Sequence, residues 1–308
     1  MLLHGGGFHT EDDFSQKKQW NKLCLMLAQR GFVTATIDYR VGWDDKDKEW
    51  NPKAKIKSSS VFATYRAYQD ARAALRFFVH HASYYGIDTT NIFIGGRSAG
   101  GDISLVTAFL SQKNIDSLVS RLIPESCHQL FGSLDSSTNT LTEQYKIRGV
   151  LNMWGPIPDT AFISKQEALA IPILLFHGTD DQSVPYKRFA PPVYPYTRDG
   201  SFNIALRYKH LGGCYQLNTK KKGGHGEDFS NEFLAEHISS FIKNVITNNC
   251  KSEEFETPVS LQSKIIALTS SSWFIPVAIV LLIVFILFIR ILIVRRRKRI
   301  VGENTNNG

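Results

Sequence analysis

Short apolar runs alternate with longer amphipathic stretches along the first 247 residues of the chain. Residues 14–30 and 62–85 carry apolar side chains at helical spacing, so we expect a helix in each. Residues 32–37, rich in β-branched side chains, and residues 91–94 are short apolar runs that predict buried strands. This alternation predicts an α/β fold with a mostly parallel sheet and helices on both faces.

The same pattern continues through the second half of this region. Two polar stretches, residues 42–60 and 113–146, fit no regular element, and we expect them to overhang the functional site as loops or a small cap. The remaining predicted elements are strands at 148–154, 172–177 and 214–219 and helices at 99–110 and 229–247.

Residues 95–101, Gly-Gly-Arg-Ser-Ala-Gly-Gly, directly follow one of the predicted strands and precede a predicted helix. A Gly-x-Ser-x-Gly sequence in this position is typical of the sharp turn that exposes a nucleophilic serine. The flanking residues must be small because the turn is strained and neighbouring backbone approaches it closely. Ser98 is therefore the candidate nucleophile.

A serine nucleophile also needs donors for the oxyanion that forms on its substrate. Residues 4–8, His-Gly-Gly-Gly-Phe, follow a short apolar strand end and match the oxyanion loop of many lipases and esterases. We expect the N–H groups of Gly6 and Gly7 to be donors. Ala99, the residue after the nucleophile, is expected to supply a third.

A base and an orienting carboxylate would complete the chemistry. Asp180 and Asp181 both follow the predicted strand at 172–177, within His-Gly-Thr-Asp-Asp-Gln-Ser-Val-Pro. We favour Asp181 as the acid, because the pattern H-G-x-x-D-x-x-V-P places a carboxylate there, and Asp180 would then cap the loop. His225 lies between glycines just before the last predicted helix, which makes it the candidate base.

The three candidates follow one another as serine, aspartate and histidine. This is the order of α/β-hydrolase triads, and it differs from the orders in chymotrypsin and subtilisin. Among the other histidines, His4 and His177 belong to glycine turns, which we expect them to brace rather than to transfer protons. The agreement of four motifs in one order predicts a serine hydrolase.

A long apolar run at residues 273–294 predicts a transmembrane helix. At 1.5 Å per residue the run spans about 33 Å, which is enough to cross the hydrocarbon core of a bilayer. We expect a polar stalk at 248–272 before it and a basic tail at 295–308 after it. By the positive-inside rule the tail is cytoplasmic and the hydrolase domain extracytoplasmic. The alternative is a tail-anchored protein with a cytosolic enzyme, since no signal peptide is visible.

The basic tail also explains most of the net charge of the chain. Residues 290–308 hold six Lys or Arg and one Glu, which leaves +3 of the total +8 for everything before. Nucleic-acid binding is therefore not expected, and the basic run fits membrane topology and contact with anionic lipids. The cysteines show no metal-binding spacing, and their even number allows one or two disulfides in an extracytoplasmic domain. They are Cys24, Cys127, Cys214 and Cys250.

Residues 1–247 resemble the carboxylesterase/lipase branch of the α/β-hydrolases. The similarity is to esterases related to hormone-sensitive lipase and to feruloyl- and acetyl-esterase-like enzymes. It rests on HGGGF, Asp38-Tyr39-Arg40, the helix at 65–77, GGRSAGG, HGTDDQSVP and GGHG.

The resemblance implies hydrolysis of carboxylic esters through an acyl-enzyme in a catalytic domain at residues 1–247, with no metal or organic cofactor. Such folds have two or more strands before the oxyanion loop, so the early strands are expected to be missing and the chain to be truncated. Asp70 and Arg72 match a helix pattern that we interpret as structural. Arg97 stands where relatives often carry Asp or Glu, which alters the charge beside the nucleophile.

Two other functions compete with a membrane-anchored serine esterase. A serine peptidase of the prolyl-oligopeptidase type shares the fold and the triad order, but such enzymes usually carry a large accessory domain. A catalytically silent adhesion or receptor domain typically loses a triad residue, whereas Ser98, Asp181 and His225 are all retained. We therefore predict an esterase that acts on a small-molecule or lipid-like ester.

Overall fold

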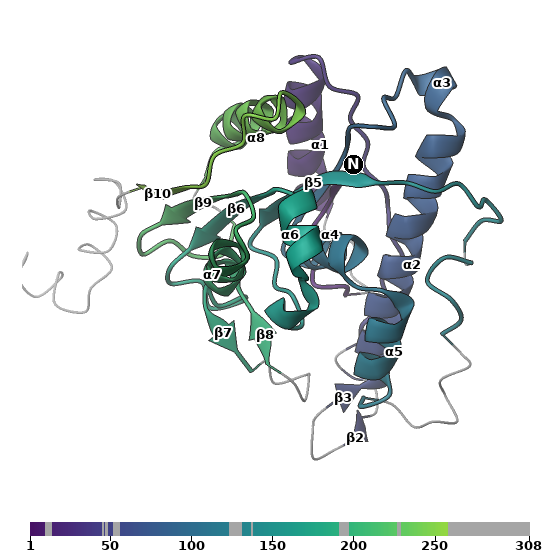
Figure 1. Cartoon of the computed structure of the whole chain (residues 1–308). Coiled ribbons are helices and arrows are strands. Elements are labelled where there is room, and N and C mark those ends of the chain that lie inside the picture. Colours follow the sequence, from purple (N-terminus) through teal and green to yellow (C-terminus); the bar gives the residue numbers. More distant parts are fainter. Residues whose placement is uncertain are drawn as a thin grey trace, which may run out of the picture. The chain divides into compact units, whose positions relative to one another are not determined.

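A six-stranded sheet forms the centre of the first unit, Met1–Thr257, of the computed structural model (Figure 1). The structure describes residues 1–9, 14–44, 46, 49–51, 56–122, 131–136, 138–190, 197–226 and 229–257. Neighbouring strands in this sheet are all parallel, which confirms the predicted α/β architecture. In spatial order they are β1 (Leu2–Leu3), β4 (Ile92–Arg97), β5 (Ile147–Met153), β6 (Ile173–Gly178), β9 (Tyr215–Lys220) and β10 (Glu253–Thr257).

Helices and two small hairpins surround the sheet. The helices of the described residues are α1 (Phe14–Ala28), α2 (Ser58–His80), α3 (Ala82–Tyr85), α4 (Ala99–Phe109), α5 (Gln112–Val119), the short 3-10 helix Thr160–Phe162, α6 (Lys165–Ala170), α7 (Ser201–Leu211) and α8 (Asn231–Ile246). The antiparallel hairpins pair β2 (Glu49–Asn51) with β3 (Ile56–Lys57) and β7 (Arg188–Phe189) with β8 (Arg198–Asp199).

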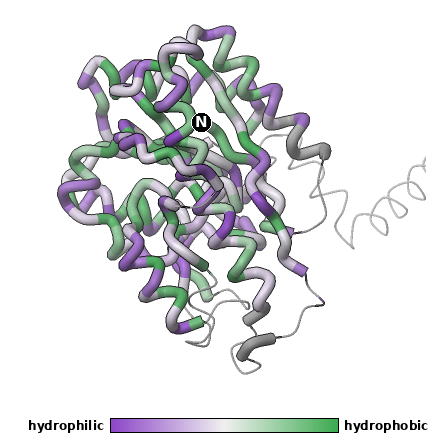
Figure 2. The backbone as a smooth tube through the Cα atoms, turned by 90° about the vertical axis from the view of Figure 1, so that its right-hand side faces the viewer, coloured by the Kyte–Doolittle hydropathy of each residue, from purple (hydrophilic) through white to green (hydrophobic). Residues whose placement is uncertain are grey.

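Alternation of side chains along the strands builds a separate core on each face of the sheet. Leu2 and Phe93 pack with α1 and α8, whereas their neighbours Leu3 and Ile94 pack with α2, α4 and α7. Successive side chains of a strand point to opposite faces, so a fully buried strand is apolar throughout. The helices cover only one core each, and hydrophilic and hydrophobic residues are interspersed along them (Figure 2).

Most of the predicted elements are present with small shifts at their ends. The strands expected at 148–154, 172–177 and 214–219 are β5, β6 and β9, and the helices expected at 99–110 and 229–247 are α4 and α8. The helix expected at 62–85 begins earlier and is divided at His81 into α2 and α3. The polar stretches contain short elements that the sequence did not indicate, namely the β2–β3 hairpin and α5.

Residues 32–37 do not form the strand that their composition predicts. The N–H of Leu2 donates to the carbonyl of Ala35 (2.8 Å), so this segment runs beside β1. However, β1 contains only Leu2 and Leu3, so it has too few backbone groups to form a ladder of hydrogen bonds with residues 32–37. A strand is defined by such pairing, and apolar β-branched composition cannot supply it alone.

The sheet extends beyond the domain boundary predicted at residue 247. Residues Glu253–Thr257 form β10, which pairs in parallel with β9, so the start of the predicted stalk belongs to the hydrolase unit. A disulfide between Cys214 and Cys250 links the start of β9 to the segment before β10. The rest of the predicted stalk, the predicted transmembrane helix at 273–294 and the basic tail lie outside the described residues. Within the described part of the chain, no helix has the length and apolar character needed to span a bilayer.

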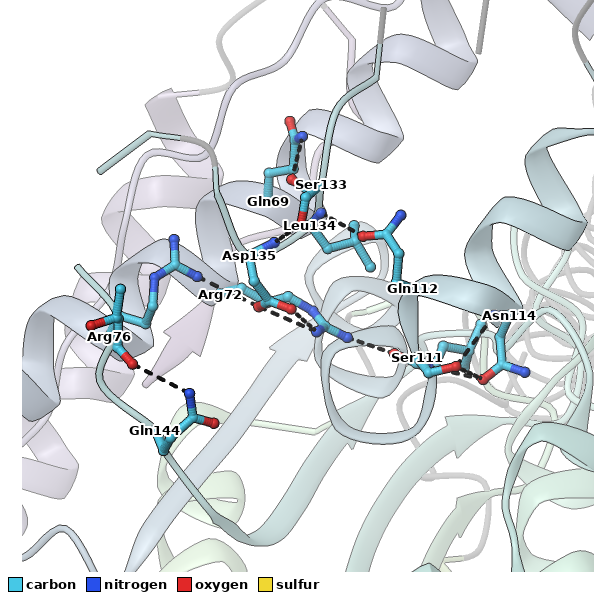
Figure 3. A network of polar contacts seen from close by, with 12 residues as sticks. Gln69, Arg72, Arg76, Ser111, Gln112, Asn114, Ser133, Leu134, Asp135 and Gln144 are labelled. Carbon is cyan, nitrogen blue, oxygen red and sulfur yellow. Dashed lines mark hydrogen bonds and ion pairs between the residues drawn. The ribbon is translucent and has the colours of Figure 1, made fainter. Parts of the chain in front are cut away.

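Polar side chains of α2 hold the segment that follows α5 (Figure 3). The guanidinium groups of Arg72 and Arg76 lie 3.1 Å and 3.5 Å from the carboxylate of Asp135. On the neighbouring turn of α2, Asp70 accepts hydrogen bonds from the backbone N–H and the guanidinium of Arg40 (2.8 Å each). Both helix residues interpreted as structural, Asp70 and Arg72, therefore make tertiary contacts of this kind.

Candidate active site

Ser98 occupies the sharp turn between β4 and α4. Its backbone has φ 54° and ψ −117°, a conformation that is strained for any residue with a Cβ atom. Backbone segments approach each other closely at this turn. A Cβ on Gly96 would lie 2.2 Å from the carbonyl carbon of Gly100, and a Cβ on Gly100 would lie 2.2 Å from the carbonyl oxygen of Leu3. The glycines on both sides of Ser98 are therefore required by the turn, as the sequence motif indicated.

The structure brings the three predicted triad residues together at the carboxyl ends of β4, β6 and β9. The Nε2 atom of His225 lies 2.8 Å from the Oγ of Ser98, and its Nδ1 lies 2.7 Å from a carboxylate oxygen of Asp181. A base within hydrogen-bond reach of a hydroxyl, and itself held by a carboxylate, is the geometry that activates a serine. This arrangement can accept the proton of Ser98 as the oxygen attacks.

Asp181, and not Asp180, contacts the imidazole. The side chain of Asp181 is fully buried, and one of its oxygens accepts the N–H groups of Ser183 and Val184 (2.9 Å each). Asp180 is exposed and its carboxylate accepts the hydroxyl of Thr179 (3.0 Å), a contact within its own loop. The preference for Asp181 in the sequence pattern agrees with this geometry.

The surroundings of Asp181 keep its carboxylate charged. Burial alone would raise the pKa of Asp181, but hydrogen bonds from His177, His225 and the N–H of Val184 hold that pKa well below its usual value. His177 is itself fully buried, and its Nε2 lies 2.8 Å from the carbonyl of Val184. Its Nε2 also lies 3.3 Å from the Asp181 carboxylate oxygen that His225 contacts, so His177 braces the acid loop, as expected of a histidine in a glycine turn.

The predicted oxyanion loop, residues 4–8, lies directly against the turn at Ser98. A Cβ on Gly100 would also lie 2.6 Å from the carbonyl oxygen of His4, so this loop and the first turn of α4 are in contact. Gly6 and Gly7 both have positive φ (118° and 63°), which turns their peptide groups in a direction that other residues rarely adopt. Among the described residues, no acceptor occupies the N–H groups of Gly6, Gly7 or Ala99. These groups can therefore donate to a substrate oxygen.

Tyr39 holds the predicted oxyanion loop in place through its hydroxyl group. The sequence did not predict this contact. The Tyr39 hydroxyl donates to the carbonyls of His4 (2.9 Å) and Gly5 (3.2 Å), and the Tyr39 ring stacks on the His4 ring at 4.3 Å. Burial raises the pKa of the Tyr39 hydroxyl far above its usual range, so it stays a donor. The motif Asp38-Tyr39-Arg40 was visible in the sequence, but its contact with the loop depends on the fold.

Tyr39→Phe is expected to lower kcat for an ester substrate by about 10-fold, which corresponds to about 1.4 kcal/mol of transition-state stabilisation. The loop loses its two hydroxyl contacts, so the oxyanion donors are held less firmly, while KM should change little. Steady-state kinetics with p-nitrophenyl acetate measures both constants. Tyr208→Phe is a matched control, because that buried hydroxyl donates to the Ile171 carbonyl (2.7 Å) at the far end of β6. Equal effects of the two substitutions would contradict the role given to Tyr39.

A buried ion pair also joins the β7–β8 hairpin to the nucleophile helix. Arg198 of the hairpin lies 2.6 Å from the carboxylate of Asp102 in the first turn of α4, and the Tyr68 hydroxyl donates to the same carboxylate (3.2 Å). All three side chains are buried. No pattern in the sequence pairs residues this far apart, so this support of the site could not be predicted.

Two further features of the described residues lie apart from the triad. A cavity of about 510 Å³ opens beside β1 and is lined by residues such as Val33, Phe78 and Ile242, but by none of the predicted site residues. No group of His, Cys, Asp or Glu side chains in the described part of the chain is arranged to hold a metal ion.

The parallel sheet, the strained turn at Ser98 and the chain order of Ser98, Asp181 and His225 are those of an α/β-hydrolase. A family model described as BD-FAE matches residues 1–168, more than half of the chain, and the chain therefore belongs to this family of α/β-hydrolase-like esterases. Membership makes it a carboxylic ester hydrolase, as the resemblance implied. No curated protein matches the chain in sequence.

Solved structures of esterase 2 from the planctomycete Thermogutta terrifontis share the fold. The butyrate-bound form matches with a TM-score of 0.52 and 18% identity, over 81% of this chain and 83% of that chain. The propionate-bound form and the form phosphoramylated by tabun each match with a TM-score of 0.51 and 19% identity, over the same shares of both chains. At this identity the likeness supports the α/β-hydrolase fold alone.

Proposed function

We propose that this chain hydrolyses carboxylic esters through an acyl-enzyme on Ser98. His225 acts as the general base, Asp181 orients it, and the N–H groups of Gly6, Gly7 and Ala99 stabilise the oxyanion. The observation that carries the proposal is the chain of contacts from Asp181 to His225 (2.7 Å) and from His225 to Ser98 (2.8 Å).

The proposed reaction proceeds in two halves. In the first half, Nε2 of His225 takes the proton of Ser98 while Oγ bonds to the ester carbonyl carbon. The tetrahedral oxyanion then collapses, the bond to the alcohol oxygen breaks, and the imidazolium returns its proton to the leaving alcohol. In the second half, His225 takes a proton from water as the water oxygen bonds to the acyl carbon. The bond from that carbon to Oγ then breaks, the acid leaves, and the imidazolium returns its proton to Ser98. The charged Asp181 holds the ring in the tautomer that both halves need.

Hydrolysis of short p-nitrophenyl esters tests this proposal. Esterase 2 of Thermogutta terrifontis has been solved with propionate and with butyrate bound, so short acyl chains are suitable first substrates. We expect release of p-nitrophenolate that stops after treatment with a fluorophosphonate. Faster cleavage of a peptide p-nitroanilide would favour the peptidase alternative, and no reaction with either probe would indicate a catalytically silent domain.

We further propose that residues 273–294 anchor the enzyme in a membrane, with the hydrolase domain on the non-cytoplasmic side. The support is the apolar run itself and the Arg- and Lys-rich sequence that follows it at 295–299. The disulfide between Cys214 and Cys250 agrees with this side, because disulfides persist in oxidising compartments. The substrate would then be a small-molecule or lipid-like ester that reaches the enzyme at a membrane surface.

Protease protection of the full-length protein in intact cells distinguishes the two orientations. Protease added outside is expected to digest the hydrolase domain and to leave a tag at the C-terminus intact, and alkaline carbonate should not release the protein. Peptides joined through Cys214 and Cys250 should be detected by mass spectrometry without reduction. A protected hydrolase domain with freely alkylated cysteines would indicate the tail-anchored alternative, and release by carbonate would exclude a membrane span.

A further inference from the structure

Arg97, the residue before the nucleophile, touches the residue after the proposed base. A Cβ placed on Gly226 would lie 1.9 Å from Nη2, 2.5 Å from Cζ and 2.7 Å from Nε of Arg97, so the guanidinium packs directly against the Gly226 backbone. His225 immediately precedes this glycine. The contact therefore connects the two loops that carry Ser98 and His225.

Trp154, the residue directly after β5, supports the guanidinium. The Cζ atom of Arg97 lies 5.7 Å from the centroid of the Trp154 ring, a cation–π distance. Trp154 is 1% exposed, its ring packs against Phe229 at 5.8 Å, and its backbone N–H donates to the Phe176 carbonyl (3.0 Å). The indole is thus a fixed surface on which the guanidinium rests.

The loop that carries His225 needs such support because of its composition. Residues 222–226 are Lys-Gly-Gly-His-Gly, and three glycines in five residues give the unsupported backbone many conformations. Nothing lies within 4 Å of the position that a Cβ on Gly224 would take, and Gly226 has a φ of 95°. A misplacement of about 1 Å in such a loop can cost about 10²-fold in rate, because the imidazole must meet the hydroxyl in one geometry.

We propose that Arg97 is a positioning residue that holds His225 in reach of Ser98 by clamping Gly226 against Trp154. The inference rests on the proposed triad function and deepens it. Trp154 belongs to the core beneath α1 and α8, so the guanidinium lies on that face of the sheet. In this proposal Arg97 acts through the base and not by contact with the substrate.

Arg97→Met keeps the length of the side chain and removes the guanidinium. We expect kcat for p-nitrophenyl acetate to fall by about 10- to 100-fold with KM within about 2-fold of wild type, since ground-state binding is untouched. Arg66→Met is the matched control, because the Arg66 guanidinium also lies over an aromatic ring, that of Phe62 at 5.4 Å, on the exposed face of α2. It should leave kcat and KM unchanged.

A double-mutant cycle with Gly226→Ala separates the clamp from a general loss of structure. The new methyl group collides with the guanidinium when Arg97 is present, so Gly226→Ala should lower kcat strongly in the wild-type background. In the Arg97→Ala background this collision is removed, and the same substitution should cost at least about 5-fold less. The unfavourable φ is common to both backgrounds and cancels in the cycle.

Hydrogen exchange of the peptide that contains residues 222–226 gives a readout that does not depend on catalysis. Its exchange should be faster in Arg97→Met than in wild type and unchanged in Arg66→Met. Unchanged exchange, strictly additive effects in the cycle, or a raised KM with unchanged kcat would each overturn the inference. If the wild-type protein hydrolyses no ester, the proposed function fails, while the exchange result still decides whether Arg97 holds the loop.

Discussion

Ser98→Ala is expected to lower kcat for p-nitrophenyl acetate by about 10⁴- to 10⁶-fold. Removal of the nucleophile abolishes the acyl-enzyme route, and only the oxyanion donors and substrate binding remain to accelerate attack by water. Among the described residues, the Ser98 hydroxyl is hydrogen-bonded to His225, and the fold should not depend on this contact. Initial rates with purified wild-type and variant protein, together with their melting temperatures, measure both effects.

Ser104→Ala provides the matched control for this prediction. Ser104 lies on the same helix, α4, and its buried hydroxyl donates to the carbonyl of Gly100 (2.7 Å). Its substitution should leave kcat within about 3-fold of wild type, because neutral hydrogen bonds of this kind contribute only about 1 kcal/mol to stability. Retention of more than a few per cent of wild-type activity by Ser98→Ala would contradict the role of Ser98.

Asp181→Asn is expected to lower kcat by about 10⁴-fold, as the loss of the carboxylate does in other serine triads. An amide in this position offers its NH₂ group or a weaker acceptor to Nδ1 of His225, which favours the wrong tautomer of the ring. The charge that stabilises the imidazolium is also removed. Kinetics at a pH where the wild-type enzyme is fully active should show a large fall in kcat and a small change in KM.

Asp180→Asn tests the competing assignment of the acid with the same chemical change one residue away. Asp180 is exposed and contacts Thr179, so its substitution should change kcat by less than about 3-fold. A larger loss in Asp180→Asn than in Asp181→Asn would mean that the loop rearranges in the working enzyme. The choice between the two aspartates in the sequence would then be wrong.

The parts of the site that follow from local geometry were predictable from the sequence. The turn at Ser98 needs small residues between a strand and a helix. The loops that carry Asp181 and His225 each follow the carboxyl end of a parallel strand, β6 or β9. The choice of Asp181 rested on spacing alone, and the contact with His225 agrees with it. Sequence patterns serve well here because each motif is set by a few neighbouring residues.

The features that were missed depend on partners far away in the chain. Residues 32–37 have the composition of a strand but lack a ladder to join, whereas β10 has four exposed residues and no apolar alternation, yet pairs with β9. The contacts of Tyr39 with the oxyanion loop and of Arg97 with Gly226 likewise join segments that only the fold brings together. Local composition carries no information about such pairs.

The most direct test of the central claim is the site of covalent labelling by a fluorophosphonate. The account predicts one adduct, mapped by tandem mass spectrometry to Ser98, that forms in step with the loss of esterase activity and is absent from Ser98→Ala. An adduct on a different serine, or complete labelling of Ser98 while ester hydrolysis continues, would contradict it.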